Sequence, residues 1–217
     1  MLKLIHFGAD RNLIALIYLL LSILIASIAI GINIIAFPSV LLDNDVSSFL
    51  IGLSSTNEII FGIIISIFLS RIVARLTAIG SALIISLIYS SLVLTIFFYQ
   101  NYYLWLLLAG LTGSCWLSLF VIRQAWINHL IANENRSIIL ALTTTIFCFG
   151  FVISSFTVNY FGAINYYLFI TSAALILLSA LLMFIVRNTQ PQKIDSQKIS
   201  IKEFLKQEPN TAIARFM

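Results

Sequence analysis

The stretch LIALIYLLLSILIASIAIGINIIAF, residues 13–37, carries no charged side chain and is long enough to decide the fold. A helix crosses a bilayer with roughly 20 mainly apolar residues. Five more continuously apolar blocks follow it, at 47–70, 76–99, 102–123, 138–160 and 164–186. Strands of a membrane barrel would be about ten residues long and would alternate with polar residues. The sequence therefore predicts an all-α, polytopic membrane protein with six transmembrane helices.

The first block also has some features of a secretory signal peptide, since basic residues precede it and residues 27–29 have the form of a cleavage site. Its apolar run continues to Phe37, which is longer than the apolar region of a typical signal. We therefore expect an uncleaved first helix. Pro38 is expected to end it, because the proline ring cannot continue the helical hydrogen-bond ladder.

The basic residues are sorted between alternate connections. Only 9% of the residues are charged, far too few to cover a soluble domain. Lys and Arg near helix ends are retained on the cytoplasmic side of a membrane. All 12 fall in the two terminal segments or in every second gap: Lys3, Arg11, Arg71, Arg75, Arg123, Arg136, Arg187, Lys193, Lys198, Lys202, Lys206 and Arg215. We therefore expect both termini in the cytoplasm and no nucleic-acid partner.

The chain is expected to divide into a cytoplasmic arm (1–12), a membrane domain (13–186) and a cytoplasmic tail (187–217). Ser137 is the predicted N-cap of the fifth helix. In the tail, Ser200 and Glu203 have the spacing of a capping box and predict a short helix. That helix would be a short surface helix lying under the bundle or, as an alternative, would dock a partner.

Glu58 is the only acidic residue well inside a block, and Asn57 precedes it. An ionised side chain at the centre of a span costs roughly 2.5 to 3.5 kcal/mol, so such a residue indicates function. Small residues that predict close helix approach form a stripe beside Glu58: Ser48, Gly52, Ser55, Gly62 and Ser66. Glu58 is therefore expected to carry a proton or meet a cationic substrate. The alternative is a protonated Glu hydrogen-bonded to a neighbouring helix.

Other polar residues in the blocks have simpler interpretations. Asn33 predicts a hydrogen bond between helices. The hydroxyl groups at 143–145 and 154–157 are expected to bond to carbonyls of their own helix. Arg123 and Gln124 are expected to end the fourth helix, where Arg123 either reaches the interface or pairs with an acidic group.

Signatures of catalysis are missing from the sequence. It contains no Gly-rich phosphate loop, no metal-spaced His cluster and no Gly-x-Ser-x-Gly elbow. Cys115 and Cys148 lie inside apolar blocks without the spacing of metal ligands. We expect no enzyme activity, no cofactor and no metal site.

Two connections carry a family resemblance. The segment at 68–75, FLSRIVAR, resembles the Gly-x-x-x-Asp-Arg-x-Gly-Arg-Arg loop of the major facilitator superfamily (MFS) at Arg71 and Arg75, with Ser70 and Val73 in place of its Asp and Gly. The segment after Arg123 resembles the Glu-Ser-Trp-Leu-Asn … Asn-x-Asn-Arg-Gly pattern of the YcaD-like branch, with Gln124 in place of its Glu. The matching residues there are Trp126, Asn128, Asn133, Asn135 and Arg136.

The resemblance implies the N-terminal half of an MFS bundle, built as 3+3 inverted repeats, from a carrier of a small solute that works by alternating access. Glu58, Asn57 and Asn33 would face its substrate or proton cavity. The implied cytoplasmic gate consists of Arg71, Arg75, Arg123, Gln124, Trp126, Asn128 and Arg136.

The leading hypothesis is a half-length transporter, from a split or truncated reading frame, in a bacterial inner membrane. Its partners would be the lipid bilayer, the solute, and either a separate C-terminal six-helix half or a second copy of the chain. The alternative is a non-transporting membrane scaffold or an inactive remnant of an MFS transporter.

Overall fold

Six long helices make up a computed structural model, which describes residues 10–99, 101–131 and 133–191. The helices are α1 (Asp10–Asp43), α2 (Ser48–Arg75), α3 (Ala78–Phe98), α4 (Tyr102–Leu130), α5 (Arg136–Phe161) and α6 (Tyr167–Ile185). Two short 3-10 helices, η1 (Asn133–Asn135) and η2 (Arg187–Thr189), follow α4 and α6. Each long helix is apolar enough to cross a membrane, and none of the described ranges contains a strand. The predicted six-helix membrane bundle is confirmed.

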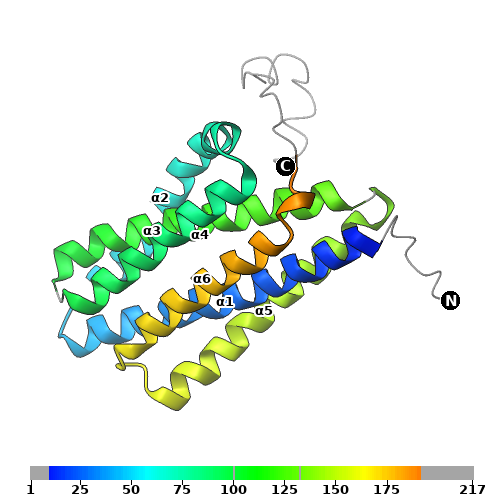
Figure 1. Ribbon diagram of the computed structural model, residues 1–217. Helices are drawn as coiled ribbons and strands as arrows, with labels where there is room; N and C mark the ends of the chain where they lie inside the picture. Colours follow the sequence, from blue (N-terminus) through cyan, green and yellow to red (C-terminus); the bar gives the residue numbers. More distant parts are fainter. Residues whose placement is uncertain (1–9, 100, 132, 192–217) are drawn as a thin grey trace, which may run out of the picture.

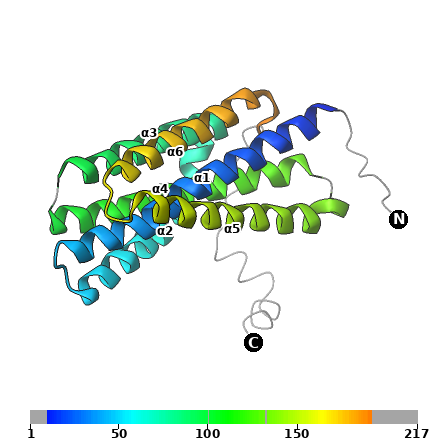
Figure 2. The ribbon, with the colours of Figure 1, turned by 90° about the horizontal axis from the view of Figure 1, so that it is seen from below.

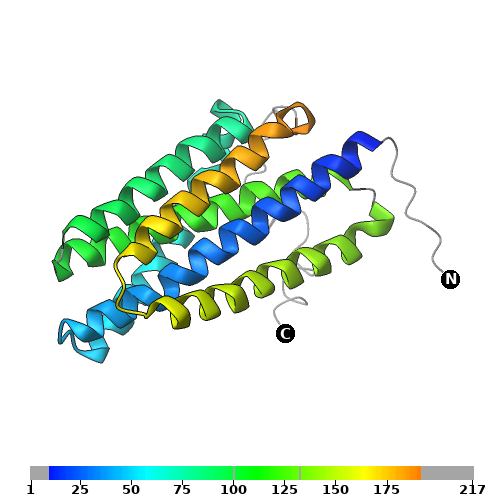
Figure 3. The same ribbon diagram turned by 60° about the horizontal axis from the view of Figure 1, so that its bottom comes forward.

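The helices are arranged as two intertwined repeats, α1–α3 and α4–α6. The middle helix of each repeat packs on the first helix of the other, so that α2 lies on α4 and α5 lies on α1. The third helices, α3 and α6, pack on each other and on the first helix of the opposite repeat. Figure 2 shows α3 and α6 together on one side, while Figure 3 shows α5 alongside α1 at the edge of the bundle. This exchange pattern is what 3+3 inverted repeats predict.

Charge is segregated between the two ends of the bundle. Both ends of the described chain lie at one end, together with the α2–α3 and α4–α5 connections (Figure 1). We call this the basic end, because Arg71, Arg136 and Arg187 lie there. The α1–α2 connection, with Asp43 and Asp45, lies at the opposite end. The sorting of charge read from the sequence is therefore a property of the folded bundle.

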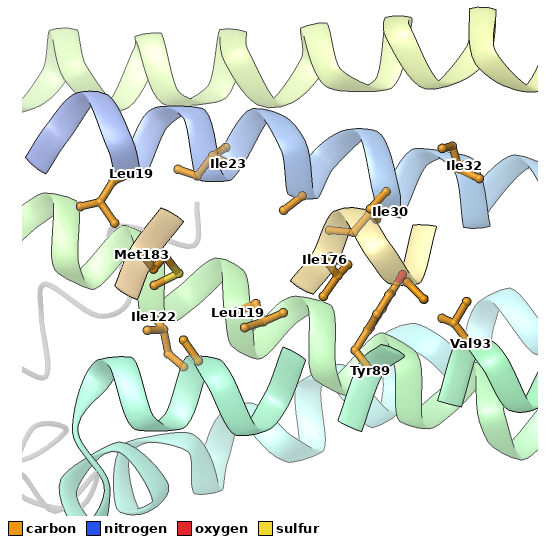
Figure 4. Packing of buried hydrophobic residues seen from close by; sticks show 14 of the residues in the cluster. Leu19, Ile23, Ile30, Ile32, Tyr89, Val93, Leu119, Ile122, Ile176 and Met183 are labelled. Carbon is orange, nitrogen blue, oxygen red and sulfur yellow. The ribbon is translucent and has the colours of Figure 1, made fainter. Parts of the chain in front are cut away.

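The core lies between α1, α3, α4 and α6 and consists mainly of Ile, Leu and Ala. Figure 4 shows Leu19 and Ile23 of α1 near Ile122 of α4 and Met183 of α6. Lipid tails are as apolar as these side chains, so helices associate in a bilayer through close packing and hydrogen bonds. Small residues and hydroxyl groups therefore decide where the helices touch.

Pro38 does not end α1, which continues through it to Asp43. A proline inside a membrane helix is tolerated when neighbouring groups bond to the freed backbone. Here the adjacent Ser39 hydroxyl donates to the Ile35 carbonyl at 2.8 Å, one turn back and next to the Ile34 carbonyl that the proline leaves without its helical donor. The first helix is consequently longer than the predicted block.

Other helix boundaries also differ from the prediction. α2 continues to Arg75, so the segment 68–75, predicted as a loop, is helical. α4 continues to Leu130, about two turns past Arg123, because the arginine is satisfied within the bundle and does not mark the membrane boundary. Ser137 is wrong as the N-cap of α5, which begins at Arg136 after Asn135. The predicted tail helix at 200–203 and residues 1–9 lie outside the described residues.

Candidate functional site

The α2–α4 contact brings two backbones unusually close. A Cβ atom on Gly113 would lie 2.4 Å from the Glu58 carbonyl oxygen and 2.6 Å from its Cα. One on Gly110 would lie 2.8 Å from Asn57 Nδ2. Only glycine permits this approach, so Gly110 and Gly113 fix the depth at which α2 lies on α4 and place Glu58 at the contact.

Glu58 lines a narrow crevice in the middle of the bundle. Five helices contribute its lining: Asn33, Phe37, Glu58, Val93, Ile96, Ala109, Thr112 and Phe169. Its volume of about 10 Å³ matches the space that one water molecule needs. Glu58 is half-buried, and its carboxyl group makes no hydrogen bond or ion pair with any residue in the described ranges. The sequence prediction that Glu58 points into protein agrees with this placement.

Asn33 lies on the opposite wall of the crevice and ties three helices together. Its Nδ2 donates to Tyr89 Oη of α3 at 2.5 Å and to Ser172 Oγ of α6 at 2.8 Å. Ser172 in turn donates to the Ala29 carbonyl at 2.9 Å. Because the serine proton is already used, Ser172 must accept from Asn33, which fixes the orientation of the amide. Asn33 Oδ1 is buried and has no partner among the described residues.

Asn57 does not join this crevice. Its amide donates to the Leu106 carbonyl of α4 at 2.6 Å, so it bonds the two helices together. The predicted stripe of small residues on α2 also divides. Gly62 is buried against Leu117 of α4, whereas the other four members, Ser48, Gly52, Ser55 and Ser66, are exposed. Most residues of the stripe therefore do not pack on α4.

Arg123 forms a second buried polar cluster, closer to the basic end. Its side chain is 2% exposed and does not reach the interface. Nε donates to Ser22 Oγ of α1 at 3.1 Å, and Nη2 donates to Ser179 Oγ of α6 at 2.9 Å. No acidic residue in the described ranges pairs with it. A buried cation held only by hydroxyl groups is costly, which indicates a use beyond packing.

The connection that follows α4 is closed by two hydrogen bonds. The buried Trp126 donates from Nε1 to the Thr189 carbonyl of η2 at 3.0 Å. Arg136 donates from Nε to Asn128 Oδ1 at 3.3 Å, joining the start of α5 to the end of α4. The two contacts involve three residues of the proposed gate, of which Asn128 and Arg136 bond to each other and Trp126 bonds to Thr189. We call these two contacts the basic-end clamp.

The remaining predicted gate residues lie apart from the clamp. Arg71 is exposed, and its guanidinium lies 5.8 Å from the Phe68 ring centroid. Arg75 is the last residue of α2. Gln124 is half-buried, and its Oε1 is buried without a partner in the described part of the chain.

Several residues of these clusters were missed by the sequence analysis: Ser22, Tyr89, Thr112, Ser172 and Ser179. Ser172 and Ser179 are seven residues apart, which places both on one face of α6. They contact α1 at positions that are also seven apart, Ala29 and Ser22. This matched spacing in α1 and α6 is the sequence feature from which the contacts of Ser22, Ser172 and Ser179 could have been predicted.

The family model of the Major Facilitator Superfamily matches residues 19–215. The chain belongs to this superfamily. It is a family of transporters and not of enzymes, and among the described residues no group of three His, Cys, Asp or Glu side chains could hold a metal ion. A search of curated proteins finds no match to the chain. The crevice around Glu58 and the basic-end clamp thus belong to an integral membrane protein of an MFS transporter family.

Proposed function

We propose that the protein transports a small solute by alternating access, with this six-helix bundle as one of two units that rock against each other. The YcaD-like branch and a bacterial inner membrane with both termini in the cytoplasm belong to the same proposal. In transporters built from repeats, the binding site lies near the midplane of the bilayer between the units. Within this bundle, the crevice with Glu58 and Asn33 lies between the two inverted repeats, α1–α3 and α4–α6, and has the polarity that an ion-binding part of such a site needs.

The observation that carries the proposal is an unpartnered carboxyl group at the centre of a bundle of this family. Burying Glu58 without a hydrogen bond or ion pair from the described residues costs stability. A purely structural scaffold would gain by an apolar residue there. A transporter that must bind and release a charged or protonated group needs a carboxyl group that is free to change partners.

A second unit would cover surfaces that this bundle leaves open. Only 11% of the α2 span and 22% of the α5 span is buried, against 44% or more for each other span. Small or hydroxyl-bearing residues recur on one exposed face of each of these helices: Ser48, Gly52, Ser55 and Ser66 on α2, and Ser137, Ala141, Thr144, Cys148 and Ser155 on α5. We call these faces the α2 stripe and the α5 stripe. Small residues allow close approach of another membrane helix.

The basic-end clamp supports a gate at the cytoplasmic side. Among the described residues, Trp126 bonds the end of α4 to η2, and Arg136 bonds the start of α5 to α4, each through one hydrogen bond. Each such bond contributes about 1 kcal/mol, so the clamp opens at modest cost. We infer that closing and opening of this contact accompanies the exchange between inward and outward states.

Uptake into proteoliposomes tests transport directly. The protein, extracted with the unit with which it assembles, is reconstituted with inward proton and sodium gradients and supplied with labelled sugars, amino acids and organic acids. We expect gradient-driven uptake of one solute class, lost by at least tenfold in Glu58→Gln. Glu134→Gln, at an exposed carboxyl in η1, is the matched control and should transport normally. No uptake of any class by correctly inserted wild type would favour the scaffold or remnant.

Cysteine crosslinking in native membranes tests the second unit. With Cys115 and Cys148 replaced by Ala, Ser55→Cys on the α2 stripe should give a crosslinked product. Leu53→Cys lies on the neighbouring exposed face of the same helix and should give none. A product of twice the chain mass identifies a homodimer, and any other mass identifies a separate half. Equal crosslinking at both positions would contradict the assigned interface.

A further inference from the structure

The polar groups that line the crevice around Glu58 all offer hydrogen-bond acceptors to it. Asn33 Oδ1 is a hydrogen-bond acceptor without a partner in the described chain, because both amide protons are committed to Tyr89 and Ser172. The Thr112 hydroxyl donates its only proton to the Ala109 carbonyl at 2.9 Å, which leaves its lone pairs. An ionised Glu58 is acceptor-only. The other lining residues are apolar.

A crevice whose polar lining atoms are hydrogen-bond acceptors, with no free donor among them, favours a positively charged occupant. An anion or a neutral acceptor would find no hydrogen to bind and would meet the Glu58 carboxylate. A particle that brings positive charge would satisfy the carboxylate and the amide oxygen together. Oxygen ligands of this kind, carboxylate, carbonyl and hydroxyl, suit hard cations.

The size of the crevice limits which cations can bind in it. About 10 Å³ accommodates a single particle of roughly the size of water. An organic ammonium group with carbon substituents would not fit without rearrangement. A divalent ion would be poorly neutralised, because Glu58 is the only titratable residue of the lining.

We propose that Glu58, Asn33 and Thr112 form a binding site for one monovalent cation of the size of sodium, at the junction of α1, α2 and α4. The site is anchored on both sides. Asn33 is oriented by Tyr89 and Ser172, and Glu58 is set by the backbone contact with Gly113. Its use as the coupling ion of transport rests on the proposed function, whereas the binding itself does not.

Thermal unfolding of the purified chain in detergent tests the binding. At constant ionic strength and a mildly alkaline pH, choline chloride is replaced stepwise by sodium chloride, and in a parallel series by potassium chloride. We expect a saturable rise of the unfolding midpoint with sodium, on the order of 5 °C at a hundred times Kd. Potassium should give a clearly smaller rise at the same concentrations.

Three variants assign the effect to the site. Glu58→Gln is nearly isosteric and should lose the sodium response. Thr112→Val removes one oxygen, and with it a hydrogen bond within α4 and none between the described helices, and should weaken sodium binding about tenfold. Glu134→Gln changes an exposed carboxyl and should respond as wild type does. The second variant keeps the test valid if Glu58→Gln does not fold.

Several results would overturn the proposal: equal midpoints in sodium and choline, equal responses to sodium and potassium, or a sodium response that survives in Glu58→Gln. Stabilisation by acid alone, with no response to sodium, would assign the crevice to a protonated Glu58 and would also overturn it. Sodium binding without uptake of any solute would leave the site standing and refute transport. Uptake that ignores sodium would leave transport standing and refute sodium as its coupling ion.

Discussion

The bundle contains two contacts that occupy equivalent places in the inverted repeats, α2 on α4 and α5 on α1. Both depend on small residues. In the first, Gly113 faces the backbone of Glu58, and in the second, Gly150 faces Ser27 while Gly31 faces Ser154. In both, the missing side chain of glycine lets the middle helix of one repeat settle onto the first helix of the other.

The chemistry of the two contacts differs. In the α1–α5 contact, the hydroxyls of Ser27 and Ser154 donate to carbonyls of their own helices, those of Leu24 and Phe151. In the α2–α4 contact, Asn57 bonds across to α4, and the next residue, Glu58, faces the crevice. The repeats therefore share a packing geometry, while an ionisable group lies at only one of the two contacts.

Substituting the glycines should have the largest effect and should separate the two contacts. Gly113→Ala would push a methyl group into the Glu58 backbone and should lower the free energy of unfolding by about 3 kcal/mol. Gly150→Ala meets the Ser27 side chain, with Oγ at 1.8 Å and Cβ at 2.7 Å, and should also destabilise. Detergent unfolding by heat measures both. Gly52→Ala, with open space around it, is the control and should be neutral or slightly stabilising.

A second substitution at the facing residue distinguishes a clash with a side chain from a clash with the backbone. Because Gly150→Ala clashes with a side chain, Ser27→Gly should restore most of the lost stability. Gly113→Ala clashes with backbone atoms, so no substitution at Glu58 should restore it. Rescue of Gly113→Ala by Glu58→Ala would contradict the backbone-to-backbone contact.

Arg123→Met should change stability in the opposite direction. Replacing a buried charge by an apolar side chain of similar volume is often neutral or stabilising by 1–4 kcal/mol. Ser22 and Ser179 would keep their own bonds, since each already donates to a carbonyl. We expect a rise of about 2 kcal/mol in the free energy of unfolding together with a loss of uptake. A strong destabilisation would make Arg123 a structural residue.

A double-mutant cycle on Asn33 and Tyr89 should give a smaller effect. Hydrogen bonds between membrane helices couple by about 0.6 kcal/mol on average and by at most about 1.7 kcal/mol. We expect Asn33→Ala and Tyr89→Phe to couple within this range. Ser90→Ala, next to Tyr89, is the control, because Ser90 donates to the Ala173 carbonyl and not to Asn33. Equal coupling in both pairs would mean that the cycle reports packing and not the bond.

The long elements of the fold could be predicted from the sequence because a bilayer imposes them. Any uninterrupted apolar run near the bilayer thickness must be a helix, since lipid cannot satisfy its backbone. Asn33 was correctly predicted to bond between helices for the same reason. The hydroxyls at 143–145 also bond to their own helix, as expected.

Features that depend on a neighbouring helix could not be predicted. From the sequence alone, Arg123 is predicted to lie at a helix end. Its burial depends on hydrogen bonds to Ser22 and Ser179, which lie on two other helices. Ser55 was predicted to pack against another helix of the bundle, but it is exposed, because α2 contacts α4 through a different face. The gate residues were taken from a resemblance, and among their described side chains the structure joins only Asn128 and Arg136 to each other.

The tryptophans of α4 provide the most selective test, because the indole N–H of Trp126 has a partner and that of Trp116 has none in the described ranges, although Trp126 is fully buried and Trp116 is half-buried. Trp126 Nε1 donates to the Thr189 carbonyl, whereas Trp116 Nε1 is buried without a partner in the described residues. Trp126→Phe should cost about 0.5–1 kcal/mol for one net hydrogen bond, plus a further loss for the space that the smaller ring leaves at this buried position. Trp116→Phe should be neutral or slightly stabilising, because it removes an unsatisfied donor. Hydrogen exchange should locate the first effect at η2, where the Thr189 and Gln190 amides would exchange faster. If the two variants unfold alike and η2 keeps its protection, the basic-end clamp does not hold α6 against α4, and the gate must be sought at Arg123 instead.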